Sequence, residues 1–324
     1  MDAGWHTGWR TMSPGQAVGS YFIGDALHYK FRFAEKGTGR KVSDTLWNKD
    51  LREQAVERWS ACKFESVIDE VVQVVHGDGS NSTMLRQRLA ANEHAINARL
   101  LHALGQLGPE KCHRLFSALL GSCLTGTRLE LAALPKDEND KAVYAVQDDG
   151  FLINDSTLIV LELKVVNRDT PHRLDPEQFW KYMGLLSLLR ESGRLADHVE
   201  VHFVALGPRG LRIFKSSLCE ALGVEPRGPD SRLSLNPDRL AQLMAENWSV
   251  LSKNARQLAE QVIRLTGAHR LSYEGVLDAV ESLVPKVDSG IVEIFRQIAH
   301  DACTKPDFSN WVTDARPHVT AHLE

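Results

Sequence analysis

Apolar and polar positions follow different periods along this chain, and the changes of period outline its elements. Residues 158–161 read Leu-Ile-Val-Leu, a continuous apolar run that is typical of a strand buried on both faces. Residues 199–206 are rich in valine and predict another strand. Asp175-Pro176-Glu177 predicts the start of a helix, because aspartate caps helices and proline favours their first position.

A β-hairpin is predicted at residues 149–164. Its two apolar strands flank the turn sequence Asn154-Asp155-Ser156. Because side chains alternate between the two faces of a strand, Glu162 and Lys164 project from the same side of the second strand. A buried strand that ends in a carboxylate and an ammonium group on one face indicates a site that needs both charges.

A second carboxylate is expected opposite Glu162 on the first strand of the hairpin. A loop of four residues places Asp149 there, and a loop of three residues places Asp148 there. We favour Asp149, because it leads directly into the apolar strand. Opposite side chains lie about 4.5–5.5 Å apart at Cβ, so two carboxylates there repel each other unless a cation lies between them. Ligation by oxygen alone favours Mg²⁺ or Mn²⁺.

These residues predict a metal-dependent phosphodiesterase. Asp149, Glu162 and the backbone carbonyl of Leu163 would hold the metal, which would bind a phosphate oxygen and lower the pKa of an attacking water. Lys164 would orient or deprotonate that water and offset charge on the pentacovalent phosphate. A structural ion pair at the end of a strand is the alternative interpretation.

The helix that begins near Asp175 adds two polar side chains. Gln178 and Tyr182 are four residues apart and therefore lie on the same helix face. Beside the strand motif, they would orient a ligand or Lys164, or bind the phosphate backbone. Taken alone, they would be an ordinary pair on a helix surface.

The series Asp149, Glu162-x-Lys164 and Gln178-x-x-x-Tyr182 resembles the PD-(D/E)xK nuclease superfamily, and the last spacing is similar to that of its RecB-type branch. The resemblance implies an α/β fold with a restriction-endonuclease-like core, a central mixed sheet flanked by helices. Its order would be helix, three-strand meander, helix, strand. The matching segments are residues 92–101, 128–131, 149–153, 157–166, 175–189 and 199–206. Gln147 or Asp148 stands where the eponymous proline would be.

The resemblance also implies an acid on the first core helix, which would complete the metal site or a second one. Glu93 is the best candidate, because it opens a helix whose other face is apolar. Acids favour the first turn of any helix through the macrodipole, so Glu93 also has a plain structural explanation. Glu65 and Glu70 are weaker candidates.

Three regions are expected. Residues 1–80 would form an N-terminal α/β segment, residues 81–225 the nuclease core, and residues 226–324 a C-terminal helical domain. The last prediction comes from apolar stripes at helical spacing and from the helix-start sequence Asn236-Pro237-Asp238. Such a domain could clamp DNA, form a homodimer or receive a protein partner.

Composition narrows the function classes. The 324 residues are 43% hydrophobic and 25% charged, as in globular proteins of two or three domains. We expect no membrane span and no signal peptide, because long apolar runs and a basic leader are missing. The five scattered cysteines favour a cytoplasmic protein without a disulfide framework or a zinc knuckle. The missing Gly-rich phosphate loop argues against ATP-driven translocation.

The net charge of −4 argues mildly against DNA as a partner, but a local basic groove matters more than the sum of charges. One basic cluster surrounds the predicted site in sequence and is expected to contact DNA: Arg168, Arg173 and Lys181. A second candidate cluster follows the strand at 199–206: Arg209, Arg212 and Lys215.

The sequence therefore predicts a cytoplasmic, Mg²⁺-dependent endodeoxyribonuclease that acts in phage defence or DNA repair. The alternative is a catalytically inactive nuclease-like module that binds DNA or a protein. The complete set of Asp149, Glu162 and Lys164 favours activity.

Overall fold

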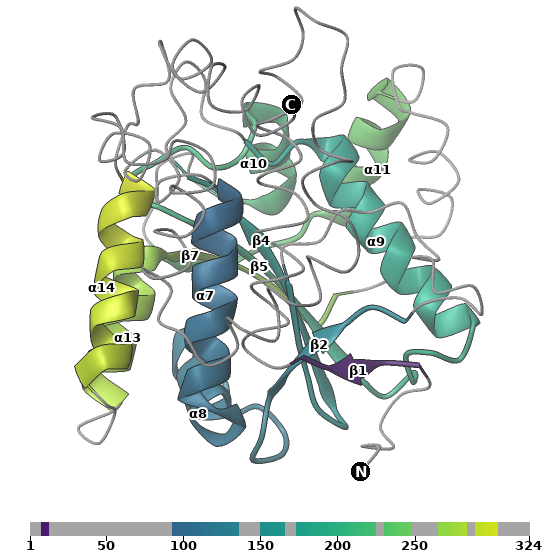
Figure 1. Cartoon of the computed structure of the whole chain (residues 1–324). Coiled ribbons are helices and arrows are strands. Elements are labelled where there is room, and N and C mark those ends of the chain that lie inside the picture. The colour runs from purple at the N-terminus through teal and green to yellow at the C-terminus, as the bar shows by residue number, and fades with distance from the viewer. Residues whose placement is uncertain are drawn as a thin grey trace, which may run out of the picture.

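The computed structural model describes residues 8–12, 93–135, 150–165, 173–224, 230–247, 265–283 and 289–303. Within these ranges, seven strands form one mixed sheet in the order β1-β2-β3-β4-β5-β7-β6, with helices on both faces (Figure 1). The strands are β1 (Arg10–Thr11), β2 (Glu130–Ala133), β3 (Gly150–Ile153), β4 (Thr157–Leu163), β5 (Glu200–Gly207), β6 (Ser231–Leu233) and β7 (Gly267–Ser272). The helices are α7 (Glu93–Leu107), α8 (Pro109–Leu119), α9 (Pro176–Glu191), α10 (Ser216–Leu222), α11 (Pro237–Asn247), α13 (Tyr273–Leu283) and α14 (Ser289–Cys303).

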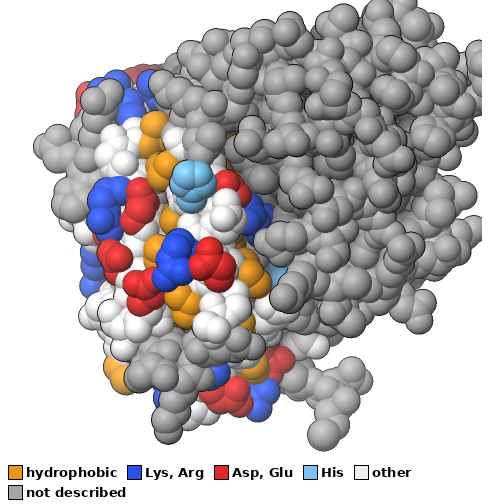
Figure 2. All heavy atoms as spheres, turned by 60° about the vertical axis from the view of Figure 1, so that its left-hand side comes forward, with side chains coloured by type: hydrophobic (Ala, Val, Ile, Leu, Met, Phe, Trp, Pro, Cys, Tyr) orange, Lys and Arg blue, Asp and Glu red, His pale blue; other side chains and the backbone are white. Residues whose placement is uncertain are grey.

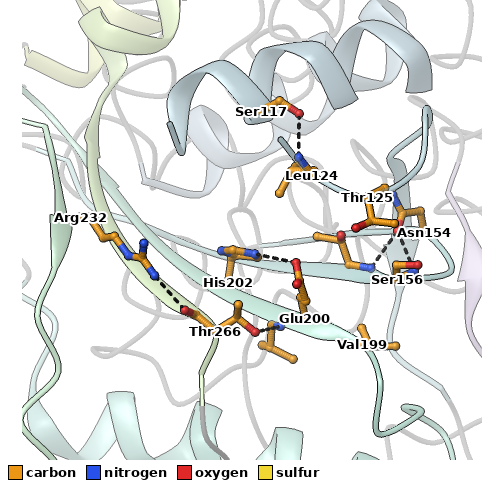
Figure 3. Close-up of polar contacts among 12 residues, drawn as sticks. Ser117, Leu124, Thr125, Asn154, Ser156, Val199, Glu200, His202, Arg232 and Thr266 are labelled. Atoms are coloured by element: carbon orange, nitrogen blue, oxygen red, sulfur yellow. Dashed lines mark hydrogen bonds and ion pairs between the residues drawn. The ribbon is translucent and has the colours of Figure 1, made fainter. Parts of the chain in front are cut away.

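The predicted hairpin is β3 and β4, which pair antiparallel from Gly150↔Leu161 to Ile153↔Leu158. The loop between the last paired residues, Ile153 and Leu158, has four residues, the longer of the two predicted loop lengths. Asn154 closes it, because its Oδ1 accepts hydrogen bonds from the backbone N–H groups of Ser156 (2.9 Å) and Thr157 (2.8 Å) (Figure 3). This register fixes which face of the sheet each hairpin residue occupies.

The chain then crosses from β4 to β5 through α9, and β5 runs parallel to β4. Asp175 caps α9 as expected, since its Oδ1 accepts from the backbone N–H of Gln178 at 2.8 Å. Apart from α8, which stands between α7 and β2 and was not predicted, the order α7, β2-β3-β4, α9, β5 agrees with the order expected for this part of the chain. α7 is longer than predicted, and β2 begins two residues later than predicted.

Two apolar cores flank the sheet. One lies between the sheet and α9 and α10, where Val160 and Phe203 meet Tyr182. The other lies between the sheet and α7, α8, α13 and α14, and it includes Ile159 and Leu104. Every residue of β4 is buried, because this central strand is covered on both faces.

The expectation of a separate helical domain at residues 226–324 is wrong for its described part. β7 pairs in parallel with β5, and β6 pairs with β7, so both strands extend the central sheet. α13 and α14 pack beside α8 and α7 (Figure 1). A buried ion pair of 2.5 Å between Arg99 and Asp301 joins α7 to α14.

Of residues 1–80, the structure describes only 8–12, where β1 pairs with β2 at the edge of the sheet. The rest of the predicted N-terminal segment, Glu65 and Glu70 included, lies outside the described residues. No helix in the described part of the chain is long and apolar enough to cross a membrane.

Candidate functional site

A cluster of polar side chains lies at the carboxyl end of β4. Glu162 comes from β4 and Lys164 from just beyond it, and Gln178 and Tyr182 come from α9. Glu93 is the first residue of α7. These five residues come from separate parts of the sequence and form one cluster, in which Lys164, Gln178 and Tyr182 bind the Glu162 carboxylate and Glu93 lies beside Lys164.

Glu162 is the centre of the cluster, and its side chain is completely buried. Its Oε1 accepts hydrogen bonds from Lys164 Nζ and from Gln178 Nε2, the latter at 2.6 Å. Its Oε2 accepts from the Tyr182 hydroxyl at 2.6 Å. Gln178 and Tyr182 reach the same carboxylate because they lie one turn apart on α9.

Lys164 is held between two acids. Besides its bond to Glu162, its Nζ lies 3.5 Å from Glu93 Oε1. Its own backbone N–H donates to the carbonyl of Leu206 on β5 at 2.7 Å, which fixes the start of the side chain. The lysine side chain is 3% exposed, whereas that of Glu93 is 24% exposed, so the cluster opens toward solvent on the Glu93 side.

Burial raises the pKa of the Glu162 carboxyl above its ordinary value. The charge of Lys164 and the hydrogen bonds from Lys164 and Tyr182 act in the opposite direction, and the charge of Glu93 raises the pKa further. Because the net shift is upward, the ionised form of Glu162 would be stabilised by a further cation.

Mg²⁺ is compatible with the described part of this cluster. A carboxylate has about four acceptor positions, and described donors fill three of those of Glu162, so one remains for a metal. Glu93 supplies a second, partly exposed carboxylate. Leu163, whose carbonyl was the predicted third ligand, ends β4 and is buried. The described residues alone do not bring together three acidic, histidine or cysteine side chains that would hold a metal.

Asp149, the remaining predicted ligand, lies outside the described residues, as does Asp148. Asp149 is covalently joined to Gly150, and Gly150 pairs with Leu161, the residue before Glu162.

The predicted basic cluster is only partly described. Arg168 lies outside the described residues. Arg173 is partly buried just before α9. Lys181 lies on α9 with its Nζ 2.8 Å from Glu177 Oε1, so a neighbouring acid neutralises its charge.

Sequence reasoning missed Arg270, which lies on β7 in the row of the sheet that contains Glu162. Its segment, Gly-Ala-His-Arg-Leu-Ser, lacks the apolar run that revealed β4. A strand of mixed composition with a glycine at its start was the available indication, and it was weak.

No protein-family model matches this chain, and no curated protein or solved structure matches it either. The assignment of a function therefore depends on the geometry of this site.

Proposed function

We propose that this chain is a Mg²⁺-dependent nuclease of the PD-(D/E)xK type, with a restriction-endonuclease-like core, which hydrolyses phosphodiester bonds in DNA. The observation that carries the proposal is the completely buried Glu162, bound by Lys164, Gln178 and Tyr182 and accompanied by Glu93. The element order α7, β2-β3-β4, α9, β5 supports the same family.

A purely structural ion pair explains this cluster less well. Burying charged groups is costly, and a buried pair contributes little net stability compared with apolar residues of similar volume. Here two acids face one lysine, and burial raises the pKa of the central acid. Among the described residues, the two carboxylates outnumber the single lysine beside a partly exposed edge, an arrangement that suits a cation.

Each side chain has a role in the proposed reaction. Glu162, with Glu93, Asp149 and the Leu163 carbonyl, would hold Mg²⁺ or Mn²⁺. The bound ion would supply Lewis-acid stabilisation of the phosphate and a more acidic water. Lys164 would donate to a phosphate oxygen or orient the attacking water. Gln178 and Tyr182 hold the Glu162 carboxylate in one orientation.

A cleavage assay tests the proposal. Linear, circular and single-stranded DNA, and RNA of the same sequence, are incubated with the protein in Mg²⁺ or in EDTA. We expect cleavage of DNA only with the metal, leaving a 5′-phosphate, and cleavage of circular DNA if the enzyme is an endonuclease. Mg²⁺ should also raise the Tm of the wild type, because it binds the folded protein.

Glu162→Gln is the decisive variant. The amide keeps the shape of the side chain, and the Tyr182 hydroxyl can turn from donor to acceptor, so the fold should remain. Cleavage should fall by at least about 10²-fold, because the variant loses a charged ligand of the metal that activates the water and the phosphate. The shift of Tm by Mg²⁺ should also shrink.

Glu220→Gln is the matched control. Glu220 lies on α10 and pairs with Arg239 at an exposed position, so its loss should leave cleavage unchanged. Full activity of Glu162→Gln would contradict the assigned site. DNA binding without cleavage by the wild type, in Mg²⁺ or Mn²⁺, would identify a binding module instead.

Location in the cytoplasm and a role in phage defence or DNA repair remain predictions.

A further inference from the structure

Arg270 lies in the same row of the sheet as Glu162. Glu162 pairs with Ala205 of β5, and Ala205 pairs with Arg270 of β7. Paired residues project from the same face, here the α9 side, to which Val160 and Ala268 contribute apolar side chains. Neighbouring strands lie about 4.8 Å apart, so the Cα atoms of Glu162 and Arg270 are about 9.5 Å apart. Only the methyl group of Ala205 stands between them in the row.

The guanidinium of Arg270 is buried and incompletely bonded. The residue is 3% exposed, and its NH2 group donates to the Leu211 carbonyl at 2.7 Å. Its buried NH1 group has no hydrogen-bond partner among the described residues. The negative charge of Asp230 favours the charged form of Arg270. The Asp230 carboxylate itself accepts a hydrogen bond from the Ser272 hydroxyl at 2.9 Å. A buried charged donor without a partner is costly, and an anion would supply one.

Two further arginines approach the same place from neighbouring segments. Arg173 precedes α9, and Arg212 lies between β5 and α10. A parallel bridge between Leu174 and Phe214 holds the two segments together, with Leu174 N–H donating to the Ile213 carbonyl at 2.8 Å. The Nε group of Arg173 is buried and also has no hydrogen-bond partner in the described part of the chain.

The three arginines lie on segments that contact one another. The Arg270 guanidinium donates to the carbonyl of Leu211, the residue before Arg212, and the bridge between Leu174 and Phe214 holds Arg173 beside the same segment. Burial raises the pKa of the Cys219 thiol, and the positive charges of Arg212, Arg270 and Arg173 all act to lower it. The action of all three charges on this one thiol agrees with the contacts between their segments.

Nearby basic side chains differ from these three, because acids neutralise them. Lys215 Nζ lies 3.1 Å from Asp175, and Arg209 NH2 lies 3.0 Å from Asp278. Within the described ranges, no carboxylate forms an ion pair with Arg173, Arg212 or Arg270. Three arginines on neighbouring segments without acidic partners suit a phosphate group, which accepts two parallel hydrogen bonds from one arginine.

We propose that Arg173, Arg212 and Arg270 form a subsite for a DNA backbone phosphate close to the phosphodiester that is cleaved at Glu162. The identity of the substrate rests on the function proposed above. Because Glu162 and Arg270 are separated by a single strand of the sheet, the bound phosphate would belong to a nucleotide near the cleaved bond. The phosphate is either an internal diester or a terminal 5′-phosphate.

The test uses the double variant Arg173→Gln/Arg212→Gln. Both side chains are only partly buried, and their removal leaves the core intact. Arg209→Gln is the control, because Arg209 lies in the same β5–α10 segment but pairs with Asp278. Binding of a short DNA duplex is measured in EDTA, where no cleavage occurs, over a range of salt concentrations.

We expect the double variant to bind about tenfold more weakly and its salt slope to fall by about one, the value for one lost phosphate contact. One neutral methylphosphonate linkage, moved along the duplex, should weaken the wild type at a single position and should not weaken the double variant further. DNA with a 5′-phosphate is compared with DNA with a 5′-hydroxyl. A loss confined to the hydroxyl form would identify the terminal phosphate as the ligand.

Inorganic phosphate separates this inference from the nuclease assignment. It should raise the Tm of the wild type and of Arg209→Gln, and it should not raise that of the double variant. That result without any DNA cleavage would keep the subsite and overturn the nuclease. DNA cleavage together with unchanged affinity, salt slope and phosphate response in the double variant would overturn the subsite. If the double variant fails to fold, each single variant is measured in the same way.

Discussion

At the scale of single residues, the site is defined by the contrast between Glu162 and Lys164. Glu162 is fixed by donors from two elements, so its carboxylate has little freedom to reorient. Lys164 is an ammonium group at the end of a flexible stem, held near the partly exposed Glu93. A buried lysine beside an open edge suits the stabilisation of charge that develops during phosphoryl transfer.

Lys164→Met tests this role, because it keeps most of the apolar stem and removes the charge. Turnover should fall by about 10² or more, while Mg²⁺-induced stabilisation and DNA affinity stay within a few fold of the wild type. Tyr182→Phe removes one hydroxyl that orients Glu162, so it should lower turnover about tenfold. Single-turnover cleavage and thermal unfolding supply the measurements. Unchanged cleavage in Lys164→Met would make the lysine a structural partner of Glu162.

At the scale of elements, the start of α9 positions the site. Asp175 caps the helix through the backbone N–H of Gln178, the same residue whose side chain binds Glu162. Its other oxygen lies 3.1 Å from Lys215 Nζ, which ties the start of α9 to the β5–α10 segment. One side chain therefore links the Glu162 cluster to the arginine subsite.

Replacement of this cap separates its two contacts. Asp175→Ala should lower the free energy of unfolding by about 1 kcal/mol, the usual value of an N-cap, and should slow cleavage several-fold because Gln178 loses its anchor. Asp175→Asn keeps a capping oxygen and loses only the charge that faces Lys215, so it should be nearly neutral. Urea unfolding of both variants measures the difference. Equal losses in the two variants would show that the ion pair matters and the cap does not.

At the scale of the whole molecule, the α9 face of the sheet carries both the Glu162 cluster and the arginine subsite. The opposite face carries a buried pair of histidines. Basic and acidic side chains lie next to one another on the side of the molecule with α13 and α14 (Figure 2), where Arg296 pairs with Glu281 at 2.7 Å. The opposite face of the sheet also buries His202 and His269, with ring centroids 5.8 Å apart. His202 lies near Glu200 (Figure 3), and Arg232 of β6 is the pairing partner of His269 on β7.

This histidine pair should make stability depend on pH. Burial lowers the pKa of His269 to about 4, and the charges of His202 and Arg232 lower it as well. Burial also lowers the pKa of His202, against the attraction of Glu200. Below a pH of about 6.5, His269 is protonated in the unfolded chain but stays neutral in the folded protein until the pH approaches 4. The free energy of unfolding therefore falls as the pH drops toward 4.

His269→Gln should flatten this dependence by up to about 1.4 kcal/mol per pH unit, the contribution of one proton. The exposed His198, whose Nε2 lies 2.9 Å from the Asp155 carbonyl, provides the control His198→Gln, which should keep the wild-type slope. Chemical unfolding at pH 7, 6, 5 and 4 measures the slopes. Identical slopes in all three proteins would exclude a contribution from the buried pair.

The features that depend on neighbours along the chain could be predicted without the structure. Alternation put Glu162 and Lys164 on one side of a strand, and the helical period put Gln178 beside Tyr182. The turn sequence at Asn154 and the cap at Asp175 set the boundaries of β3, β4 and α9. All of these are fixed by local backbone geometry, so a short window of sequence contains the information.

Contacts between distant segments became apparent in the tertiary structure. It brought Glu93 to Lys164, placed β7 beside β5 in place of a separate helical domain, and set Arg270 in the row of Glu162. The pairing of distant strands depends on the free energy of the whole core, since each strand can satisfy its hydrogen bonds with several partners. No local pattern around Arg270 shows which strand its own strand will pair with. For this reason the arginine subsite became visible only in the fold.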